Sequence, residues 1–346
     1  MPRHAPRDPH RPTLTERPDV TVSATRPSLE RHGRPTRSPD DGPGRTPRRR
    51  AARSFAPLWL LTPAGLVLVF VTIAPIVFLV VTSFTDYDQR SLFTGAYDAV
   101  GLAQYGRILG DPAFWASLVR TVLFTAAMVL GSILIGAGVS HLMTRLGVVL
   151  RYAVTIVLIC AWGMPNVASS LVWNWLFQPG YGVVNWALTQ LRVFGDVTDT
   201  DWGNSAGLAY TSIWMLVVWQ AVPFIALTLY AAETQIPLEV KEAVRLDGGS
   251  EWTVYRVVTV EYLRPTLLLV TMLSIIWDFN VFNQIWLVSQ GGPDGATSTL
   301  GVFTYVTAFV GHDIGTGSAV AVIAALILMA LSALYIRNLV RSGEEL

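Results

Sequence analysis

The chain has 346 residues, of which 52% are hydrophobic and 14% are charged, whereas a soluble domain carries roughly 25% charged residues. Residues 1–54 hold 13 Arg and 6 Asp or Glu, so the other 292 residues carry only 30 charges. The net charge of +1 is therefore a cancellation and does not indicate nucleic-acid binding. The single cysteine, Cys160, excludes an internal disulfide framework and a multi-cysteine metal site. The composition predicts a polytopic membrane protein and excludes an ordinary soluble enzyme.

The first 54 residues are rich in arginine and proline and contain almost no large apolar side chains. Such a segment cannot bury enough surface to offset its ordering entropy, so we expect residues 1–54 to be a disordered cytoplasmic tail. Its basic run at 48–50 suits the flank of a membrane span, and contact with anionic lipid headgroups is the alternative. A cleaved twin-arginine signal is not favoured, because the uncharged stretch 54–85 is too long and no cleavage site ends it.

Apolar stretches long enough to cross a membrane recur along the rest of the chain. A spanning helix needs about 20 apolar residues. Five charge-free windows meet this length, and a sixth is interrupted only by Asp278. Residues 178–190 contain a Pro-Gly pair and predict an external loop with Trp186 at the membrane interface. We therefore predict an all-α integral membrane protein with six transmembrane helices, at 58–83, 113–143, 149–176, 207–232, 265–289 and 315–338.

The positions of lysine and arginine predict the orientation of these spans. With the N-terminus in the cytoplasm, 21 Lys and Arg residues fall in inner segments. Only Arg90, Arg107 and Arg192 fall in outer segments, and Arg120 lies within the second span. Basic residues accumulate on the cytoplasmic side of membrane proteins. We expect a multi-pass protein of the plasma membrane with both termini cytoplasmic.

The predicted inner segment 233–264 is much longer than a turn requires. Pro237 suits the start of a helix and Gly248-Gly249 suits its end, which predicts a helix of about ten residues. A second helix is expected from 250 to about 260. A short helix across the cytoplasmic face is typical of a docking element, and a helix lying on the membrane surface without a partner is the alternative. Its predicted apolar side comprises Val240, Ala243, Val244 and Leu246.

The same segment resembles the E-A-A motif of permease subunits of bacterial binding-protein-dependent ABC importers. That motif reads E-A-A, three residues, G, nine residues, then I-x-L-P. Here it reads Glu242-Ala243-Val244, three residues, Gly248, nine residues, then Val258-Thr259-Val260-Glu261. The departures are Val244 for Ala, valines at 258 and 260, and Glu261 for the proline at which the helix normally breaks. Pro265 is the expected place of that break here.

The resemblance covers nearly all of residues 55–346 and is greatest to the carbohydrate-import branch of that family. It extends to Gly101-Leu102-x-x-Tyr105, to Trp219-x-x-x-Pro223-Phe224 and to Gly291-Gly292-Pro293. It implies a type I ABC importer permease fold in a transmembrane permease domain, 55–346, with 233–264 as the cytoplasmic docking loop. The ATPase-docking residues that it implies are Glu242, Ala243, Arg245, Asp247 and Gly248.

The resemblance also implies a function and a set of partners. The chain would form half of the translocation pore of an ATP-driven sugar importer, beside a second permease subunit in a heterodimer. Two ATPase subunits and an extracytoplasmic solute-binding protein would complete the importer. No G-x-x-x-x-G-K occurs here, so ATP is expected on the partner subunits and no cofactor on this chain. We expect no enzymatic activity and no metal site, since His141 and His312 have no second ligand nearby in the sequence.

Polar side chains are concentrated in the fifth predicted span. Asp278 is its one acid at hydrocarbon depth, where ionisable residues are costly and usually functional. Ser274, Asp278 and Val281 are spaced to share one helix face, which Trp277 and Gln284 border. Carboxylates, amides and aromatic rings together suit a sugar, which has hydroxyl groups and an apolar ring face. This face is predicted to line the substrate path, and hydrogen bonding between helices is the alternative.

The resemblance places the substrate path on the fourth and fifth spans. Carried over by motif, its positions are Gln220, Ala221 and Phe224, with Ser274, Asp278 and Val281. In the third span, polar and aromatic residues such as Asn166 and Trp173 are expected to serve packing instead. An ion-coupled secondary transporter of a small polar solute is the alternative function, but it requires inverted repeats and broken helices, and the sequence has no internal repeat.

Overall fold

The computed structural model describes residues 56–192 and 194–341, with side chains for 61–192 and 194–337. Every regular element in these ranges is helical, and the only β pairing there is an isolated bridge between Thr85 and Ala99. Residue contacts divide the chain into two units, Met1–Leu58 and Trp59–Leu346, and nearly all described residues belong to the second. The predicted tail, 1–54, lies outside the described residues.

Six membrane spans are present when a bent pair of helices is taken as one. In the described residues, five helices are long and apolar enough to cross a membrane. The bent pair is α6 (Val148–Trp162) with α7 (Asn166–Leu176). The predicted all-α membrane fold is thereby confirmed. The five single spans are Leu61–Thr82, Pro112–Arg145 (α5), Ala206–Glu233 (α9), Glu251–Phe279 and Ile314–Arg337.

Several of these spans are built from more than one element. The first comprises α1 (Ala56–Leu68), a π-helical turn and α2 (Ala74–Thr82). The fifth comprises α11 (Glu251–Val254), a π-helical turn and α12 (Val260–Phe279), and the last lies in α15 (Ile314–Arg341). The shorter helices are α3 (Gln89–Thr94), α4 (Ala103–Leu109), α8 (Val183–Gln190), α10 (Leu238–Leu246), α13 (Asn283–Ser289) and α14 (Leu300–Tyr305).

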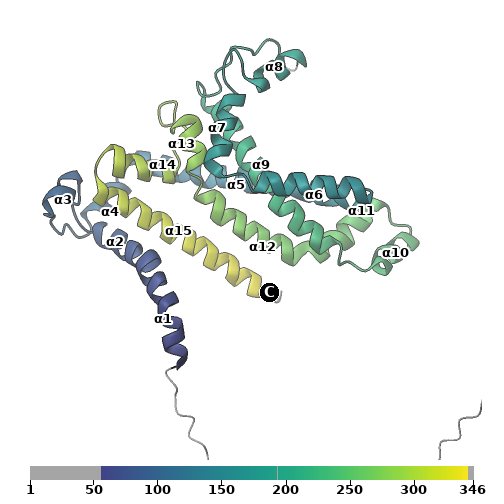
Figure 1. Cartoon of the computed structure of the whole chain (residues 1–346), viewed down its shortest axis with the longest axis horizontal. Helices are drawn as coiled ribbons and strands as arrows, with labels where there is room; N and C mark the ends of the chain where they lie inside the picture. Colours follow the sequence, from purple (N-terminus) through teal and green to yellow (C-terminus); the bar gives the residue numbers. More distant parts are fainter. Residues whose placement is uncertain (1–55, 193, 342–346) are drawn as a thin grey trace, which may run out of the picture. The chain divides into compact units, whose positions relative to one another are not determined.

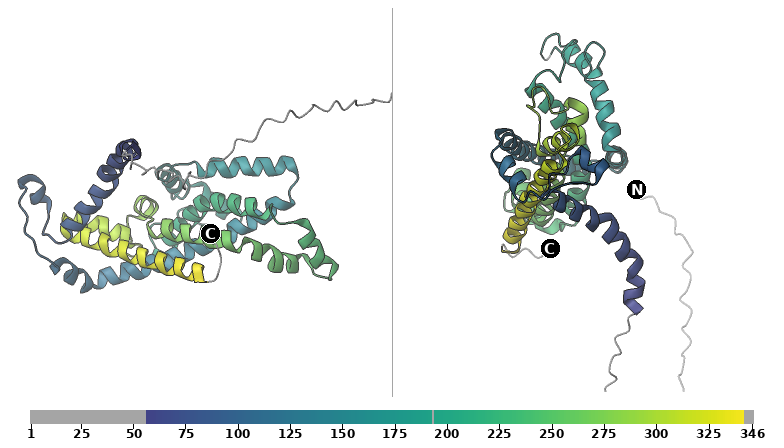
Figure 2. Two further views of the ribbon diagram at one scale, coloured as in Figure 1. Left: turned by 90° about the horizontal axis from the view of Figure 1, so that it is seen from below. Right: turned by 90° about the vertical axis from the view of Figure 1, so that its left-hand side faces the viewer.

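Helices α5 and α9 pack closely at the centre of the bundle, and α12 lies beside both (Figures 1 and 2). Glycines on α5 make the approach possible. A Cβ on Gly136 would lie 2.6 Å from Ile225 Cγ2, and a Cβ on Gly131 would overlap the Trp214 ring. Trp214 Nε1 donates to the Ala127 carbonyl at 2.9 Å. Small residues of this kind let two membrane helices approach each other closely, and van der Waals attraction stabilises the resulting contact.

Polar side chains join the remaining helices to this centre. Thr82 Oγ1 on α2 donates to Ser318 Oγ on α15 at 3.0 Å. The backbone N–H of Leu300, at the start of α14, donates to Thr121 Oγ1 on α5 at 2.8 Å. All four residues are buried, so these hydrogen bonds satisfy polar groups that water cannot reach.

The third span is bent, whereas a single helix over 149–176 was predicted. α6 ends at Trp162, α7 begins at Asn166, and the two helices meet at 100°. Figure 1 shows α7 leaving α6 almost at right angles. The turn between them reads Gly163-Met164-Pro165. Proline has no N–H to continue the helical ladder, and it disfavours helical backbone at the residue before it. The prediction rested on uncharged length and did not weigh this turn.

The fifth span also differs from the prediction of 265–289. It starts earlier, because the expected second docking helix runs through a π-helical turn into α12 as one continuous helix. It breaks at neither Glu261 nor Pro265, both of which lie inside α12. It ends earlier, at Phe279, and α13 is a separate helix. Asn280 terminates it, since its side-chain Nδ2 donates to the Ile276 carbonyl at 2.8 Å.

The predicted external loop 178–190 contains a helix, α8, over its second half. Gly182 precedes α8, and Asn185 on it is buried, donating to three backbone carbonyls, those of Gln178, Thr198 and Thr200. Trp186, expected at the membrane interface, is 60% exposed. The polar composition of this loop therefore reflects internal hydrogen bonds as well as contact with water.

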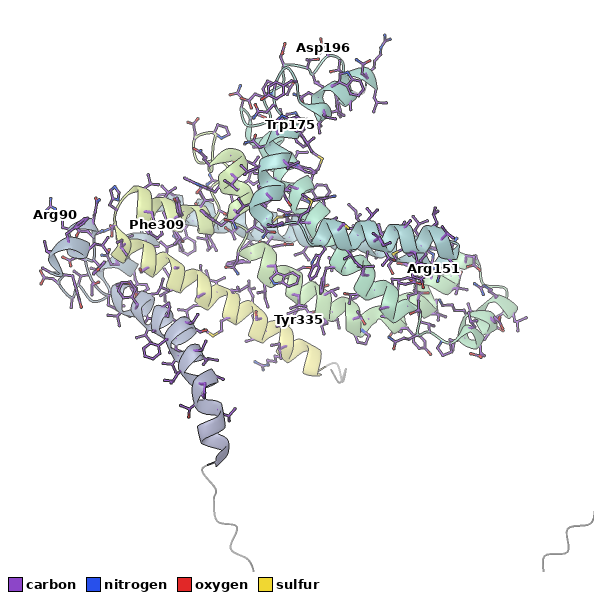
Figure 3. All side chains as sticks on the ribbon, in the orientation of Figure 1. Arg90, Arg151, Trp175, Asp196, Phe309 and Tyr335 are labelled. Carbon is purple, nitrogen blue, oxygen red and sulfur yellow. The ribbon has the colours of Figure 1, made fainter. Side chains whose placement is uncertain are left out.

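The two ends of the bundle carry different elements. Arg90 and Phe309 lie at the end that holds α3 and α14, whereas Arg151 lies towards the end that holds α10 and α11 (Figure 3). The docking loop thus shares its end with the junction of α5 and α6, as the predicted topology requires. Arg145 and Glu251 lie 3.8 Å apart across that junction.

Candidate functional site

A cavity of about 450 Å³ opens in the middle of the bundle. The elements α6, α7, α9, α12 and α13 contribute its walls, together with the turns at 163–165 and 280–282. Its lining combines amides, aromatic rings and one carboxyl group. The lining residues are Trp162, Met164, Asn166, Val217, Gln220, Ala221, Phe224, Ile276, Trp277, Asp278, Asn280, Val281, Phe282, Asn283 and Gln284.

The two helix breaks place polar groups in this cavity. The bend in the third span brings Trp162, the last residue of α6, and Asn166, the first of α7, to its wall. The end of the fifth span does the same for Asn280 and Asn283. Irregular backbone at membrane depth is tolerated where it lines a cavity or is buried in protein. The cavity therefore gives a physical reason for the breaks in these two spans.

A chain of amide hydrogen bonds crosses the cavity wall. Gln284 Nε2 donates to Gln220 Oε1 at 2.9 Å, and Gln220 Nε2 donates to Asn166 Oδ1 at 3.3 Å. These bonds connect α13, α9 and α7 and fix the orientation of the three amides. Gln284 Oε1 and Asn166 Nδ2 remain without a partner among the described residues, so one acceptor and one donor group are available to a ligand.

Three aromatic side chains form another part of the wall. The rings of Trp162 and Phe224 are nearly parallel, with centroids 6.2 Å apart, and Phe224 meets Trp277 edge to face at 5.3 Å. Trp277 is half exposed. An aromatic surface of this kind can pack against the apolar face of a sugar ring while its edges stay in contact with polar groups.

Asp278 is the only ionisable residue in the cavity lining. It lies in the last turn of α12, and only 6% of it is exposed. Its Oδ2 is buried and accepts no hydrogen bond from any described residue. Removing a carboxylate from water is costly without compensating partners, so this atom calls for a donor from outside the described chain. Within the described ranges, no hydrogen bond joins the Asp278 side chain to a neighbouring helix, so the alternative role as a contact between helices has no support there.

Six of the seven predicted path residues lie in the cavity lining, namely Gln220, Ala221, Phe224, Trp277, Asp278 and Val281. Ser274 is buried in α12 and is not part of the lining. The predicted shared face is wrong for Val281, because α12 ends before it and the turn at 280–282 places it instead. Sequence analysis missed Trp162 and assigned Asn166 to packing, although both lie in the lining, and the Gly-x-Pro turn between them was the signal that could have found them.

The docking helix α10 ends in a turn that depends on glycine. Gly248 has φ +83°, a left-handed conformation that favours glycine, as its place after the predicted helix indicated. The Gly249 N–H donates to the Val244 carbonyl at 2.9 Å, and a Cβ on Gly249 would lie 2.7 Å from that oxygen. The five predicted docking residues, Glu242, Ala243, Arg245, Asp247 and Gly248, are all exposed.

The start of α11 secures the docking helix. Arg245 donates to Glu251 through Nε at 2.7 Å and through Nη2 at 3.2 Å. These hydrogen bonds raise the pKa of Arg245 above its usual value. Large apolar side chains nevertheless stay uncovered on this loop, since Leu238, Leu246 and Trp252 are 68%, 89% and 69% exposed. Exposed apolar side chains gathered on one loop are typical of an interaction surface.

A buried glutamate forms an ionisable pair with a partly exposed histidine close to α10. Glu233, the last residue of α9, is 3% exposed, and its Oε1 lies 3.1 Å from His141 Nδ1 on α5. The His141 ring packs edge to face on Tyr255 at 4.6 Å. Sequence analysis expected no partner ligand for His141, and Glu233 is a hydrogen-bond partner for it. Among the described residues, no group of three His, Cys, Asp or Glu side chains could hold a metal ion.

Comparison with known proteins places these features in a family. Residues 128–342 match the family described as "Binding-protein-dependent transport system inner membrane component". The chain belongs to this family. The predicted resemblance to ABC importer permeases is thereby confirmed, and an ion-coupled secondary transporter is not favoured.

Relatives within the family include permease subunits for several sugars. The chain is 36% identical to the diacetylchitobiose uptake system permease protein DasB of Streptomyces coelicolor, over 90% of this chain and 98% of the relative. It is 29% identical to the sulfoquinovosyl glycerol transport system permease protein SmoG of Agrobacterium fabrum, over 80% and 88%. It is 27% identical to the trehalose/maltose permease protein MalF of Thermococcus litoralis, over 69% and 79%.

A solved structure agrees on the fold. A chain of a bacterial ABC transporter that imports the acidic polysaccharide alginate superimposes with a TM-score of 0.71 at 14% sequence identity. The match covers 84% of this chain and 97% of the alginate transporter chain. At this identity the likeness concerns the fold alone, and it confirms the predicted type I importer permease architecture.

Proposed function

We propose that this chain is a transmembrane permease subunit of an ATP-driven sugar importer and forms half of its translocation pore. The observation that carries the sugar assignment is the cavity, whose lining combines aromatic rings, amides and one buried carboxyl group. Sugars require this combination, since their rings have apolar faces and their hydroxyls both donate and accept hydrogen bonds. The names of the relatives, which concern diacetylchitobiose, sulfoquinovosyl glycerol and maltose, support the same class.

The partners follow from the family and from the surfaces left uncovered. A second, non-identical permease subunit would complete the pore opposite the cavity wall. Two ATPase subunits would dock on α10 at Glu242, Ala243, Arg245, Asp247 and Gly248. A solute-binding protein would deliver the sugar at the end that holds α3 and α14. The distribution of basic residues supports cytoplasmic positions for both termini of this inner-membrane component.

ATP would act on this chain only through its partners. The ATPase subunits bind and hydrolyse the nucleotide, and their closure moves α10. Because α10 follows α9 directly and connects through Arg245 and Glu251 to the fifth span, its movement reaches α9 and α12, two of the helices that line the cavity. The Glu233–His141 contact ties the end of α9 to α5, so α5 moves with them.

The test is reconstitution of the importer with and without a change on α10. A tagged chain is expressed with its partner permease, ATPase and solute-binding protein, and the complex is placed in proteoliposomes. We expect sugar uptake that depends on ATP, and ATP hydrolysis that sugar-loaded binding protein stimulates. Glu242→Lys should reduce both by at least about tenfold, since it reverses a charge at an exposed protein contact.

The matched control is Asp199→Lys, the same kind of charge reversal in the exposed loop between α8 and α9. It should leave co-purification of the ATPase unchanged. Uptake that proceeds without ATP, or a chain that never associates with an ATPase subunit, would contradict the proposed function. Uptake that persists at the wild-type rate in Glu242→Lys would contradict the docking assignment only.

A further inference from the structure

The cavity lining contains an acidic group and no basic group. Among the lining residues there is no lysine, arginine or histidine, and Asp278 is the single ionisable group. All other polar side chains in the lining are uncharged amides, those of Asn166, Gln220, Asn280, Asn283 and Gln284. The described half of the pore therefore offers a ligand one carboxyl group and neutral donors and acceptors, and nothing that would neutralise an acid.

The position of Asp278 strengthens the effect of this charge on a ligand when the carboxyl group is ionised. Its burial to 6% exposure limits screening by water, and its Oδ2 has no hydrogen-bond donor among the described residues. A hydroxyl, an acetamido N–H or an ammonium group on the ligand can supply the missing donor. A carboxylate or sulfonate cannot supply a donor, and it adds a second negative charge to a site of low dielectric.

The amide chain does not change this balance. Of its free groups, Gln284 Oε1 accepts and Asn166 Nδ2 donates, so it treats hydroxyl-bearing ligands of either charge alike. The aromatic rings of Trp162, Phe224 and Trp277 in the lining carry no net charge, and the faces of such rings attract cations and not anions. Discrimination by charge consequently rests on Asp278.

We infer that this cavity accepts neutral and amine-bearing saccharides and rejects carboxylated or sulfonated ones, with Asp278 as the specificity-determining residue. The inference rests on the proposed function, since it supposes that the cavity lies on the sugar path. It adds the chemical class of sugar, which neither the fold nor the family determines.

Direct binding to the purified, ATP-free importer complex tests the inference without the solute-binding protein, whose own selectivity is thereby excluded. The probes are three matched disaccharides: cellobiose, which is neutral, chitobiose with its amines protonated, and cellobiouronic acid. Dissociation constants are measured by calorimetry. Cellobiose and chitobiose should bind the wild-type complex, and cellobiouronic acid should bind at least about tenfold more weakly than cellobiose, because juxtaposed like charges are penalised.

Variants of similar size separate charge from shape. Asp278→Asn should reduce the preference for cellobiose over cellobiouronic acid by about tenfold and weaken chitobiose relative to cellobiose. Asp278→Glu, which keeps the charge, should retain the preference. Asp199→Asn, in the exposed loop between α8 and α9, is the matched control and should change none of the three constants. Elution as an intact complex in size-exclusion chromatography shows that each variant assembles.

Equal affinity of the wild-type complex for cellobiose and cellobiouronic acid would overturn the inference, as would an unchanged ratio in Asp278→Asn. Failure of the proposed function gives a different result. In that case none of the three sugars binds the wild-type complex, and the charge assignment falls with the sugar assignment. If neutral and amine-bearing sugars bind while the acid does not, and Asp278→Asn removes the difference, the proposed function and the charge inference are both supported.

Discussion

Asp278 combines burial with an unmet need for a hydrogen-bond donor. A carboxylate at the centre of a bilayer costs about 2.5–3.5 kcal/mol on insertion-derived scales, which makes a position facing lipid implausible. The residue instead faces a cavity of about 450 Å³, and its Oδ2 has no described partner. In the proposed function, a ligand supplies the donor that this atom lacks.

Replacement of Asp278 should impair transport and spare assembly. We expect Asp278→Ala to lower sugar uptake and sugar-stimulated ATP hydrolysis by at least about tenfold, because losing one charge-assisted hydrogen bond costs about 1.5–3 kcal/mol. Asp278→Asn should be milder, because its amide keeps one acceptor. Uptake in proteoliposomes measures both effects. If Asp278→Ala prevented the two permease subunits from assembling and Asp278→Asn assembled fully, Asp278 would be a contact between helices and not a path residue.

Gly249 is a second single position on which function should depend. Its N–H closes the end of α10, and a Cβ would lie 2.7 Å from the Val244 carbonyl oxygen, closer than real Cβ atoms approach. Gly249→Ala should displace the turn, at a cost of about 1–3 kcal/mol for overpacking, and should lower stimulated ATP hydrolysis.

The control for this substitution is Gly147→Ala. Gly147 precedes α6 in the neighbouring inner turn, and no heavy atom would lie within 4 Å of its Cβ. Hydrolysis rates of the two reconstituted variants give the comparison. Equal rates in both would mean that the geometry of the α10 turn does not govern coupling.

Among the elements, the contact between α5 and α9 sets the spacing of the bundle. Gly136 lies against Ile225, whereas Gly138, two residues along the same helix, faces open space. This pair separates helix packing from helix propensity, because both substitutions to alanine improve propensity equally. Only one of them inserts a methyl group into a close contact.

Gly136→Ala should therefore destabilise the protein by about 1–3 kcal/mol, the usual cost of overpacking, while Gly138→Ala is neutral or slightly stabilising. Thermal unfolding of the detergent-solubilised protein measures the difference in midpoint temperature. A midpoint for Gly136→Ala at or above that of Gly138→Ala would contradict close packing at Ile225.

Breaks in two spans add residues to the cavity wall, beside those that the unbroken helix α9 supplies. Both breaks, after Trp162 and after Phe279, occur where the cavity lies, and each supplies lining residues from its turn. The uninterrupted spans α5 and α15 contribute no residue to the lining. Regular helix satisfies the backbone within lipid, and irregular backbone is placed where a cavity can solvate it.

At the scale of the whole molecule, the chain is one part of a larger assembly. Helix α6 has no buried residue, and large apolar side chains on it are exposed, among them Val149, Ile156 and Trp162. Lipid, a second permease or both would cover this surface in the membrane. The docking loop leaves Leu246 and Trp252 exposed in the same way, at the end of the bundle where ATPase subunits are proposed to bind.

The first 50 residues should be dispensable for transport. They are rich in arginine and proline and poor in apolar residues, so no buried contact with the permease domain is expected from them. A variant lacking residues 2–50, with Arg53 retained as a basic flank, should take up sugar at the wild-type rate per molecule in the membrane. Immunoblotting of membranes normalises the rate. Loss of uptake at normal abundance would assign a role to this segment.

The sequence by itself determined the class of fold, the number of spans, the family and the place of the docking helix. These depend on local properties: runs of apolar residues long enough to cross a bilayer, and a proline and two glycines that bound a short helix. The tail and the orientation of the termini stay predictions, since they concern residues outside the described ranges and a membrane that the chain alone does not define.

The tertiary structure decided which residues share the cavity. Asn166 on α7, Gln220 on α9 and Gln284 on α13 are far apart in the sequence, yet one chain of hydrogen bonds joins them. Helical periodicity indicated Asp278, which lies in the cavity lining, but it placed Val281 on the same helix face because it assumed a helix that continues past Phe279. A break in a helix resets the direction of every later side chain, and whether a break forms depends on the space that neighbouring helices leave for it.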